Sequence, residues 1–532
     1  MYPNKLRNKL IPTYYISVLL FLILIFTVSS ASAVPAFARK YQANCSLCHS
    51  NEPRLTPFGQ RFLENGYQFP STTDGNETSK LVFDGEQGPV TLDKLSNMMA
   101  VRIRGDIQRA TFRDISHEMK AEGVDERTSV EFPKIVNFFF AGTVTDNISY
   151  FIEAEYNTME DPGGETSVIF ERTFMQFSNI GGAQGVTNFK IGRFDPASLF
   201  AFPTHRQQLN PILPIADTDQ YPPNINRVPL LPLAFSSKMF GLSNATSAQG
   251  TQIRGEGGYN EGFALLPFEP TLYNAPMQSG MAVHGRPWGD GSPFLYQIGL
   301  AMNEKAADNF GHVEQRIDTY LMLRFDFDMA GAETQVSGFY YNAPDAARAT
   351  LVNIMPAMND ATNNSIVYAS NSTDINRYGI GMRSQWGQFD VYAAYIIDTI
   401  DEPQWGAAPL RTSEWETDGS ALSAEVDWRF KKQWMLAVRY DYMQPGGLKR
   451  LPKVATASGS ANDAINATVQ FIAPMVKYYP SPNIGLYVRS HINITSSTTL
   501  PNTNGRVDGF SGQQHPGSNL QNMLTFGVDM AF

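Results

Sequence analysis

From about Met99 to the C-terminus, apolar and polar residues alternate in segments of about ten residues, separated by clusters of Gly, Asn, Asp, Pro and Ser. Alternation with a period of two is typical of a β-strand that has one apolar face. The clearest examples begin at Ile148, Phe294, Phe389 and Trp434. Counting the segments gives roughly sixteen, with an uncertainty of about two, and single-chain transmembrane barrels favour even numbers. We therefore expect a large antiparallel sheet.

The polar face of these segments distinguishes a barrel from a soluble β-sandwich, which shows the same alternation. Arg324 and Asp326 flank Phe325, and Glu153 follows Ile152, so charged residues stand opposite large apolar ones. In a transmembrane barrel the polar side chains line a wet lumen and the apolar ones contact lipid. The sequence therefore predicts an all-β transmembrane barrel of about 16 antiparallel strands at residues 97–532, porin-like and located in the cell outer membrane. A final alternating segment that ends at Phe532 resembles the end of bacterial outer-membrane barrels; the alternative is a buried last strand of a soluble sheet.

The N-terminus has the pattern of a secretory signal peptide over residues 1–33. Lys5, Arg7 and Lys9 precede a short apolar core, and a small-residue stop follows at Ala31-Ser32-Ala33. An anchoring helix is the alternative, but the apolar core is short for a membrane span. No later segment approaches the roughly 18 consecutive apolar residues of a membrane helix, so the mature chain is either soluble or spans the membrane as a barrel.

The composition excludes one class of partner and favours another. The full chain has a formal net charge of −10, and its leader carries only basic charges, so the mature part is still more acidic. An acidic chain argues against a nucleic-acid partner. Charged residues make up 17% of the chain and aromatic residues 12%, a balance that suits a surface in contact with outer-membrane lipid.

The only two cysteines stand in one pentapeptide, Cys45-Ser46-Leu47-Cys48-His49. In this spacing both sulfurs can reach the two vinyl groups of a haem, while His49 lies beneath the iron as the proximal ligand. A redox disulfide is the alternative for the two cysteines, but no βαβ pattern surrounds them and the adjacent histidine is explained only by haem. The sequence therefore predicts one covalent haem c.

Residues 34–96 form the predicted monohaem c-type cytochrome segment, small and α-helical. A segment of this size can barely sustain a fold with its own core, so the haem must supply much of its apolar interior. We expect this segment to lie inside the barrel or against its mouth, because the lipid-spanning wall has no redox cofactor of its own.

The candidates for the distal haem ligand can be narrowed by elimination, because no methionine or histidine occurs between Ser50 and Asn97. The first candidates are Met98 and Met99, at the junction with the first strand, and a methionine ligand would raise the haem potential relative to bis-histidine ligation. Ordinary packing is the alternative role for this pair. His117, Met119, a ligand from the barrel wall or an open sixth position are the other choices.

The surroundings of the haem motif resemble a known family. Pro35-Ala36-Phe37-Ala38-Arg39 precedes it, and Pro53 to Gly59, Phe62 and Gly66-Tyr67 follow it. This pattern is similar to the fused monohaem cytochrome–porins of the outer membrane, a family that includes iron(II)-oxidising proteins of neutrophilic and acidophilic bacteria. The match is close over residues 35–67 and architectural beyond, and Lys40-Tyr41-Gln42 replaces the more usual Gln-Thr-Gly before the first cysteine.

The resemblance implies electron transfer: extracellular iron(II), or another small reductant, gives one electron to the haem, which passes it to a periplasmic carrier. On this reading the chain is an electron-transfer oxidoreductase, an iron(II)-oxidising cytochrome. Two alternatives stay open. One is a porin or channel with a haem-containing plug, and the other is a haem peroxidase-like enzyme that uses His117 or His205 as its distal acid-base group. The sequence leaves the oligomeric state open.

Overall fold

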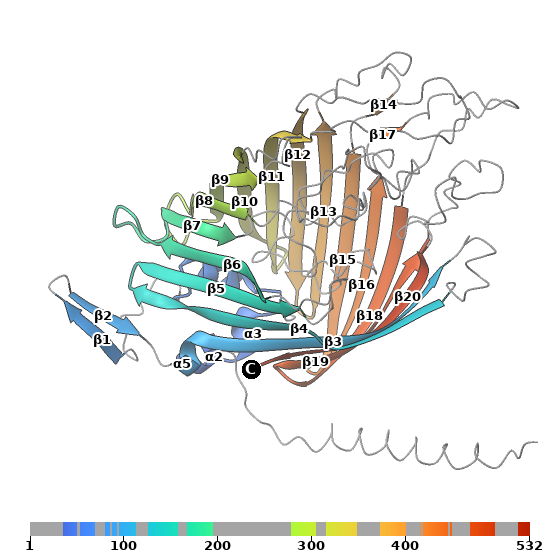
Figure 1. Cartoon of the computed structure of the whole chain (residues 1–532), viewed down its shortest axis with the longest axis horizontal. Helices are drawn as coiled ribbons and strands as arrows, with labels where there is room; N and C mark the ends of the chain where they lie inside the picture. Colours follow the sequence, from blue (N-terminus) through green and yellow to red (C-terminus); the bar gives the residue numbers. More distant parts are fainter. Residues whose placement is uncertain are drawn as a thin grey trace, which may run out of the picture.

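The computed structural model describes fifteen stretches of the chain (Figure 1). They are residues 36–50, 54–69, 80–85, 88–92, 95–112, 126–157, 168–194, 278–304, 315–347, 373–400, 415–416, 419–444, 447–448, 469–494 and 520–532. The predicted signal peptide lies outside these residues, as do His117, Met119 and His205.

Sixteen antiparallel strands form one closed barrel, which confirms the predicted fold and strand number. Each strand pairs with its neighbour in the chain, and the last strand closes the barrel on the first, with Phe526 opposite Ile107. The barrel strands are β3 (Met99–Phe112), β4 (Glu126–Thr145), β5 (Ile148–Asn157), β6 (Val168–Phe177), β7 (Asn188–Phe194), β8 (Gln278–Gly285), β9 (Phe294–Glu304), β10 (Gln315–Met329), β11 (Ala332–Ala347), β12 (Thr373–Trp386), β13 (Phe389–Ile400), β15 (Gly419–Lys431), β16 (Trp434–Gln444), β18 (Val469–Ser481), β19 (Ile484–Asn493) and β20 (Leu520–Ala531). Two short strands, β14 (Trp415–Glu416) and β17 (Gly447–Leu448), pair with each other outside the barrel sheet.

The two faces of the barrel wall differ as the alternation predicts. Phe325, Ile380 and Phe526 point outward and are 46%, 59% and 49% exposed, whereas Arg324 on the inner face is 1% exposed. Exposed apolar residues that follow the strands all around a closed sheet fit lipid, because soluble proteins rarely expose large apolar patches. The chain is an outer-membrane β-barrel. None of the helices in the described part of the chain is long and apolar enough to cross a membrane.

The two ends of the barrel have different connections. At one end lie the start of β3, the end of β20 and seven links between strands, five of which are two-residue turns. The links at the other end include residues 195–277, which contain the proline-rich stretch 196–232 and lie outside the described residues. Because short turns face the periplasm and long loops face the exterior in outer-membrane barrels, we assign the turn end to the periplasm.

The N-terminal segment is helical, as expected, and also contains a β-hairpin. Its helices are α2 (Ala36–Tyr41), α3 (Cys45–Cys48), α4 (Pro57–Glu64) and α5 (Leu95–Met98), and its hairpin pairs β1 (Lys80–Gly85) with β2 (Gly88–Leu92). The first barrel strand follows α5 directly. Residues 36–50 and 54–69, which we call the plug, lie within the barrel near its turn end (Figure 1).

The plug contacts many strands of the inner wall. Side chains or main-chain atoms of the plug meet residues of β3, β6, β8, β10, β11, β12, β13 and β15 through hydrogen bonds or ion pairs. Residues of β18, β19 and β20 line a cavity together with plug residues. The plug is therefore held against many strands of the inner wall, within the barrel rather than beneath it.

Candidate functional site

The haem motif folds into one turn of helix, α3, which places both cysteines on the same short element. The side chain of Asn44 caps the turn by accepting a hydrogen bond from the Ser46 N–H at 3.1 Å, the usual role of asparagine at this position. Cys45 and Cys48 are half-buried and are not joined in a disulfide. His49 follows at the end of the turn, with its N–H bonded to the carbonyl of Cys45 at 2.9 Å.

Helix α4 packs closely against the end of this turn. Thr56 caps α4 by accepting a hydrogen bond from the Gly59 N–H at 3.0 Å, and its own hydroxyl donates to the carbonyl of Leu47 at 2.7 Å. A Cβ atom on Gly59 would lie 2.1 Å from the carbonyl oxygen of Cys48, so only glycine permits this approach. Gly59, which belongs to the stretch that follows the haem motif in the sequence, thus brings α4 into contact with α3.

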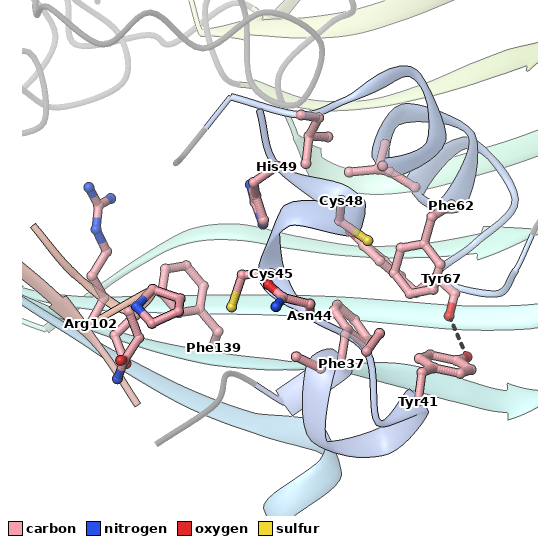
Figure 2. A pocket seen from close by; sticks show the side chains of 18 of the residues that line it. Phe37, Tyr41, Asn44, Cys45, Cys48, His49, Phe62, Tyr67, Arg102 and Phe139 are labelled. Atoms are coloured by element: carbon pink, nitrogen blue, oxygen red, sulfur yellow. Dashed lines mark hydrogen bonds between the residues drawn. The ribbon is translucent and has the colours of Figure 1, made fainter. Parts of the chain in front are cut away.

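The motif opens onto a cavity between the plug and the barrel wall (Figure 2), with a volume of about 290 Å³. This volume lies near the lower limit of roughly 300 Å³ for small-molecule sites. Cys45, Cys48 and His49 line the cavity together. The plug adds apolar and aromatic residues, and the wall adds more; the aromatic members are Phe37, Tyr41, Phe62, Tyr67, Phe69, Phe139, Phe151 and Tyr479.

Most of the aromatic side chains of the cavity form one connected cluster. Phe37 stacks on Tyr67 at 5.1 Å between ring centroids, and Tyr67 stacks on Phe151 of β5 at 5.7 Å. Phe62 contacts Phe37 edge to face at 5.1 Å. Such pairs add to the stability gained by burying the rings, so the cluster ties the plug to the wall and keeps the cavity apolar.

Thiol chemistry is disfavoured at this site. Burial and, to a smaller extent, the nearby Cys45 together raise the pKa of Cys48 to about 11. A thiol with such a pKa stays protonated at neutral pH, whereas disulfide exchange and metal–thiolate binding need the thiolate. The local environment therefore argues against the redox-disulfide alternative.

The side chain of Arg54, in the plug, lies in a buried cluster of carboxylates that belong to the wall. It is fully buried and forms ion pairs with Asp390 at 3.2 Å, with Asp427 at 2.9 Å and with Glu425. Burial alone would lower the pKa of Arg54, but the three carboxylates outweigh it and raise the pKa, so the guanidinium stays charged. Arg383 of β12 also pairs with Asp390 at 2.8 Å and donates to the carbonyl of Leu55 at 2.6 Å.

A second ion-pair cluster lies at the end of α4 and has the opposite polarity. Glu64 pairs with Arg324 of β10 at 2.7 Å and with Arg286 at 3.0 Å, and both arginines also pair with Asp326. Burial would raise the pKa of Glu64, but Arg324 and then Arg286 outweigh it and lower the pKa. The plug is thus bound to the wall through a cation, Arg54, at β13 and β15 and through a carboxylate, Glu64, at β10 and Arg286. Neither Arg54 nor Glu64 is among the site residues that the sequence predicted.

The residues present fit a covalently bound haem c. Two unbridged cysteines on one helical turn and the following histidine all line the same cavity. Aromatic side chains supply the apolar walls that a tetrapyrrole ring needs, and the fit therefore rests on the geometry of the cavity as well as on the motif.

The structure places the candidate distal ligands elsewhere. Neither Met98 nor Met99 lines the cavity. The sulfur of Met98 accepts a hydrogen bond from the Tyr150 hydroxyl at 3.2 Å, and the carbonyl of Met99 accepts one from Arg39 at 2.6 Å. The structure thus brings together Cys45, Cys48 and His49 but not these methionines, whose role as ligands stays a prediction.

Comparisons with known proteins give only remote similarities. No family model matches the chain, and no curated protein matches it. Among solved structures, similar chains include OmpF of Salmonella typhi (11% identity, TM-score 0.41, covering 83% of this chain and 98% of that one). OprB of Pseudomonas putida is also similar, with 10% identity and a TM-score of 0.42 over 82% of this chain and 94% of that one. A loop-deletion mutant of OmpT of Vibrio cholerae has 9% identity and a TM-score of 0.40 over 82% of this chain and 98% of that one.

Proposed function

We propose that this protein is an outer-membrane electron-transfer protein of the fused monohaem cytochrome–porin kind. In this proposal one haem c is bound to Cys45 and Cys48, with His49 as proximal iron ligand. An extracellular iron(II) ion loses one electron and becomes iron(III), and a periplasmic carrier gains that electron. The observation that carries the proposal is the position of the C-x-x-C-H turn, which lines an apolar cavity inside a closed barrel.

The placement of the plug supports a route across the membrane. Its cavity lies near the turn end, which we assign to the periplasm, while its ion pairs with Glu425 and Arg324 lie on the inner face of the wall. A redox centre held there is within the barrel, so a small hydrated reductant can approach through the polar lumen. A carrier protein can approach from the opposite side. Iron(II) as the donor rests on the sequence resemblance.

The chain's own residues would bind and position the cofactor. The two cysteines hold its edge, and the aromatic cluster around Tyr67 excludes water from its faces. Arg54 and Glu64 fix the plug against the wall, so the distance between the site and either side of the membrane stays constant. When bound, the haem supplies a one-electron redox couple, and electron transfer needs only such positioning and a tuned potential.

A channel is the second candidate, because a sixteen-stranded barrel of this kind can conduct solutes. The plug, which is held inside the barrel by contacts with many strands, argues against a wide open pore at the turn end. Leakage of small solutes from liposomes containing the protein, at a rate independent of haem reduction, would favour the channel.

The test is anaerobic mixing of the oxidised, purified full-length protein with iron(II) at acidic and at neutral pH. We expect rapid appearance of the reduced haem spectrum at one or both pH values. Zinc(II), a divalent ion without redox chemistry, is the matched control and should leave the spectrum oxidised. A haem that stays oxidised in iron(II) at both pH values would contradict iron(II) as the donor.

A further inference from the structure

Most of the buried arginines on the inner wall have carboxylate partners; Arg383, for example, pairs with Asp390 at 2.8 Å. Arg489 of β19 differs from them. It is 7% exposed, its Nε atom has no hydrogen-bond partner, and no acidic side chain in the described part of the chain forms an ion pair with it. Its guanidinium lies instead over the ring of Tyr487, 5.3 Å from the ring centroid. Arg489 is therefore a buried cation without a negative partner among the residues described.

The residue directly opposite Arg489 also has an unused polar group. Thr525 of β20 is the register partner of Arg489, so their Cβ atoms are about 5 Å apart. Both side chains belong to the inner face, because their chain neighbours Val488 and Phe526 are exposed on the outer one. Thr525 is fully buried, and among the described residues its hydroxyl has no hydrogen-bond partner. Gln108 of β3 stands opposite Thr525 in turn, so a guanidinium, a hydroxyl and a carboxamide form one row across three neighbouring strands (Figure 1).

The ring of Tyr487 lies between this row and the next carboxylate of β20, Asp529. Tyr487 stands opposite Gly527, and a Cβ atom on Gly527 would lie only 2.1 Å from the ring carbon Cζ, so the ring covers the glycine. Asp529 follows Gly527 on the same face and is bound to Arg102, whose Nε donates to it at 2.8 Å. Asp529 is therefore not a partner for Arg489.

The row calls for an anion, because a buried charge is stable only when it is paired and a buried donor without a partner costs free energy. The guanidinium, the hydroxyl and the carboxamide can all donate hydrogen bonds. The guanidinium fork in particular matches two oxygens of one carboxylate, sulfate or phosphate group. We propose that Arg489, Thr525 and Gln108 form a binding site for a small oxyanion inside the barrel.

This oxyanion site is separate from the haem-motif cavity, since none of its three residues lines that cavity. It is built by the barrel wall alone. Because the plug occupies the turn end, the anion reaches the site through the lumen from the opposite end. The site needs no haem, so it can fail or stand independently of the proposed function.

The experiment measures anion binding to the full-length protein in detergent micelles, by equilibrium dialysis with radiolabelled sulfate, phosphate and acetate in chloride at constant ionic strength. We expect the wild type to bind at least one of these anions. Arg489→Met should weaken binding by about tenfold or more, because charge-assisted hydrogen bonds are lost, and Thr525→Val should weaken it less. Arg109→Met, which removes an exposed arginine of β3, is the matched control and should bind as the wild type does.

Stability provides a second measurement, which a purely structural arginine would change in the opposite direction. An anion that binds only the folded protein lowers the unfolding equilibrium constant, by about tenfold when its concentration is roughly ten times the dissociation constant. The wild type should show this effect and Arg489→Met should not. Without the anion, Arg489→Met should be at least as stable as the wild type, because it removes a buried charge that has no partner.

The three anions also distinguish the sources of the ligand. Binding of acetate alone would assign a carboxylate ligand, and binding of sulfate or phosphate would assign a tetrahedral one. Equal binding by the wild type and Arg489→Met, or no binding of any of the three anions by the wild type, would overturn the oxyanion site. Neither result bears on the haem, which the mass of the mature protein tests separately.

Discussion

Replacing Arg54 by methionine removes the plug's contact with the carboxylates of β13 and β15. Arg383 still pairs with Asp390, but Glu425 and Asp427 are left as neighbouring buried carboxylates without their plug cation. Removing one partner from a buried ionic cluster costs about 3–5 kcal/mol. Since about 1.4 kcal/mol corresponds to a factor of ten, the population of the unseated plug should rise on the order of a hundred- to several-thousand-fold.

Limited proteolysis with chymotrypsin measures this population, because the plug contains several phenylalanine and tyrosine residues that are largely covered in the seated state. When opening and closing are fast, the rate of cleavage follows the equilibrium population of the open form. We expect cleavage within residues 36–69 of the Arg54→Met variant to accelerate by the factor above, with fragment masses locating the cuts in the plug.

The matched control is Arg61→Met, which removes the same charge from the same segment but does not touch the carboxylate cluster. A second variant adds Glu425→Gln and Asp427→Asn to Arg54→Met. Because this variant removes the buried negative charge that Arg54 had balanced, much of the wild-type resistance should return. Equal cleavage rates for Arg54→Met and Arg61→Met would refute the reasoning that buried charge holds the plug.

Three further predictions follow from the site. Because the pKa of Glu64 is lowered, its ion pairs stabilise the seated plug fully above the ordinary carboxyl pKa of 4.5, and this stabilisation is lost as the pH falls below 4.5. Sensitivity to protease should therefore begin to rise below about pH 4.5. This dependence on pH should be weaker in the Glu64→Gln variant. Gly59→Ala forces a Cβ atom against the Cys48 carbonyl and should destabilise the plug by about 1–3 kcal/mol. The haem absorption spectrum should then change at a lower denaturant concentration than in the wild type. Gly338→Ala, at a position with open space around it, is the control and should have little effect. Met98→Leu and Met99→Leu test the predicted methionine ligand. Loss of a far-red absorption band of the oxidised haem in either variant would identify that ligand, whereas wild-type spectra in both variants would exclude the pair, which is the result that their position outside the cavity favours.

The barrel could be predicted from the sequence because its signal is local. A period of two fixes which face of a strand is apolar, so Phe325 and Arg324 could be assigned to opposite faces without knowledge of their partners, and repetition of the pattern gave the strand number. The haem motif is local as well, since Cys45 to His49 lie in one turn.

The position of the plug could not be predicted because its contacts join residues far apart in the chain. Arg54 and its partner Glu425 are 371 residues apart, and an arginine or glutamate in a short polar segment usually lies on a solvated surface. One signal was present: Asp390, Glu425 and Asp427 lie on the polar faces of two consecutive strands close to their turn ends. Three neighbouring carboxylates directed into a lumen call for a cation from elsewhere in the chain.

The proposed function requires a haem that is covalently bound within the plug of this barrel. The mass of the intact, mature protein extracted from outer membranes tests it most directly. We expect a mass that exceeds that of the processed polypeptide by one haem, with the extra mass on the peptide containing Cys45 and Cys48. An unmodified polypeptide mass, from cells that attach haem to their other c-type cytochromes, would contradict it.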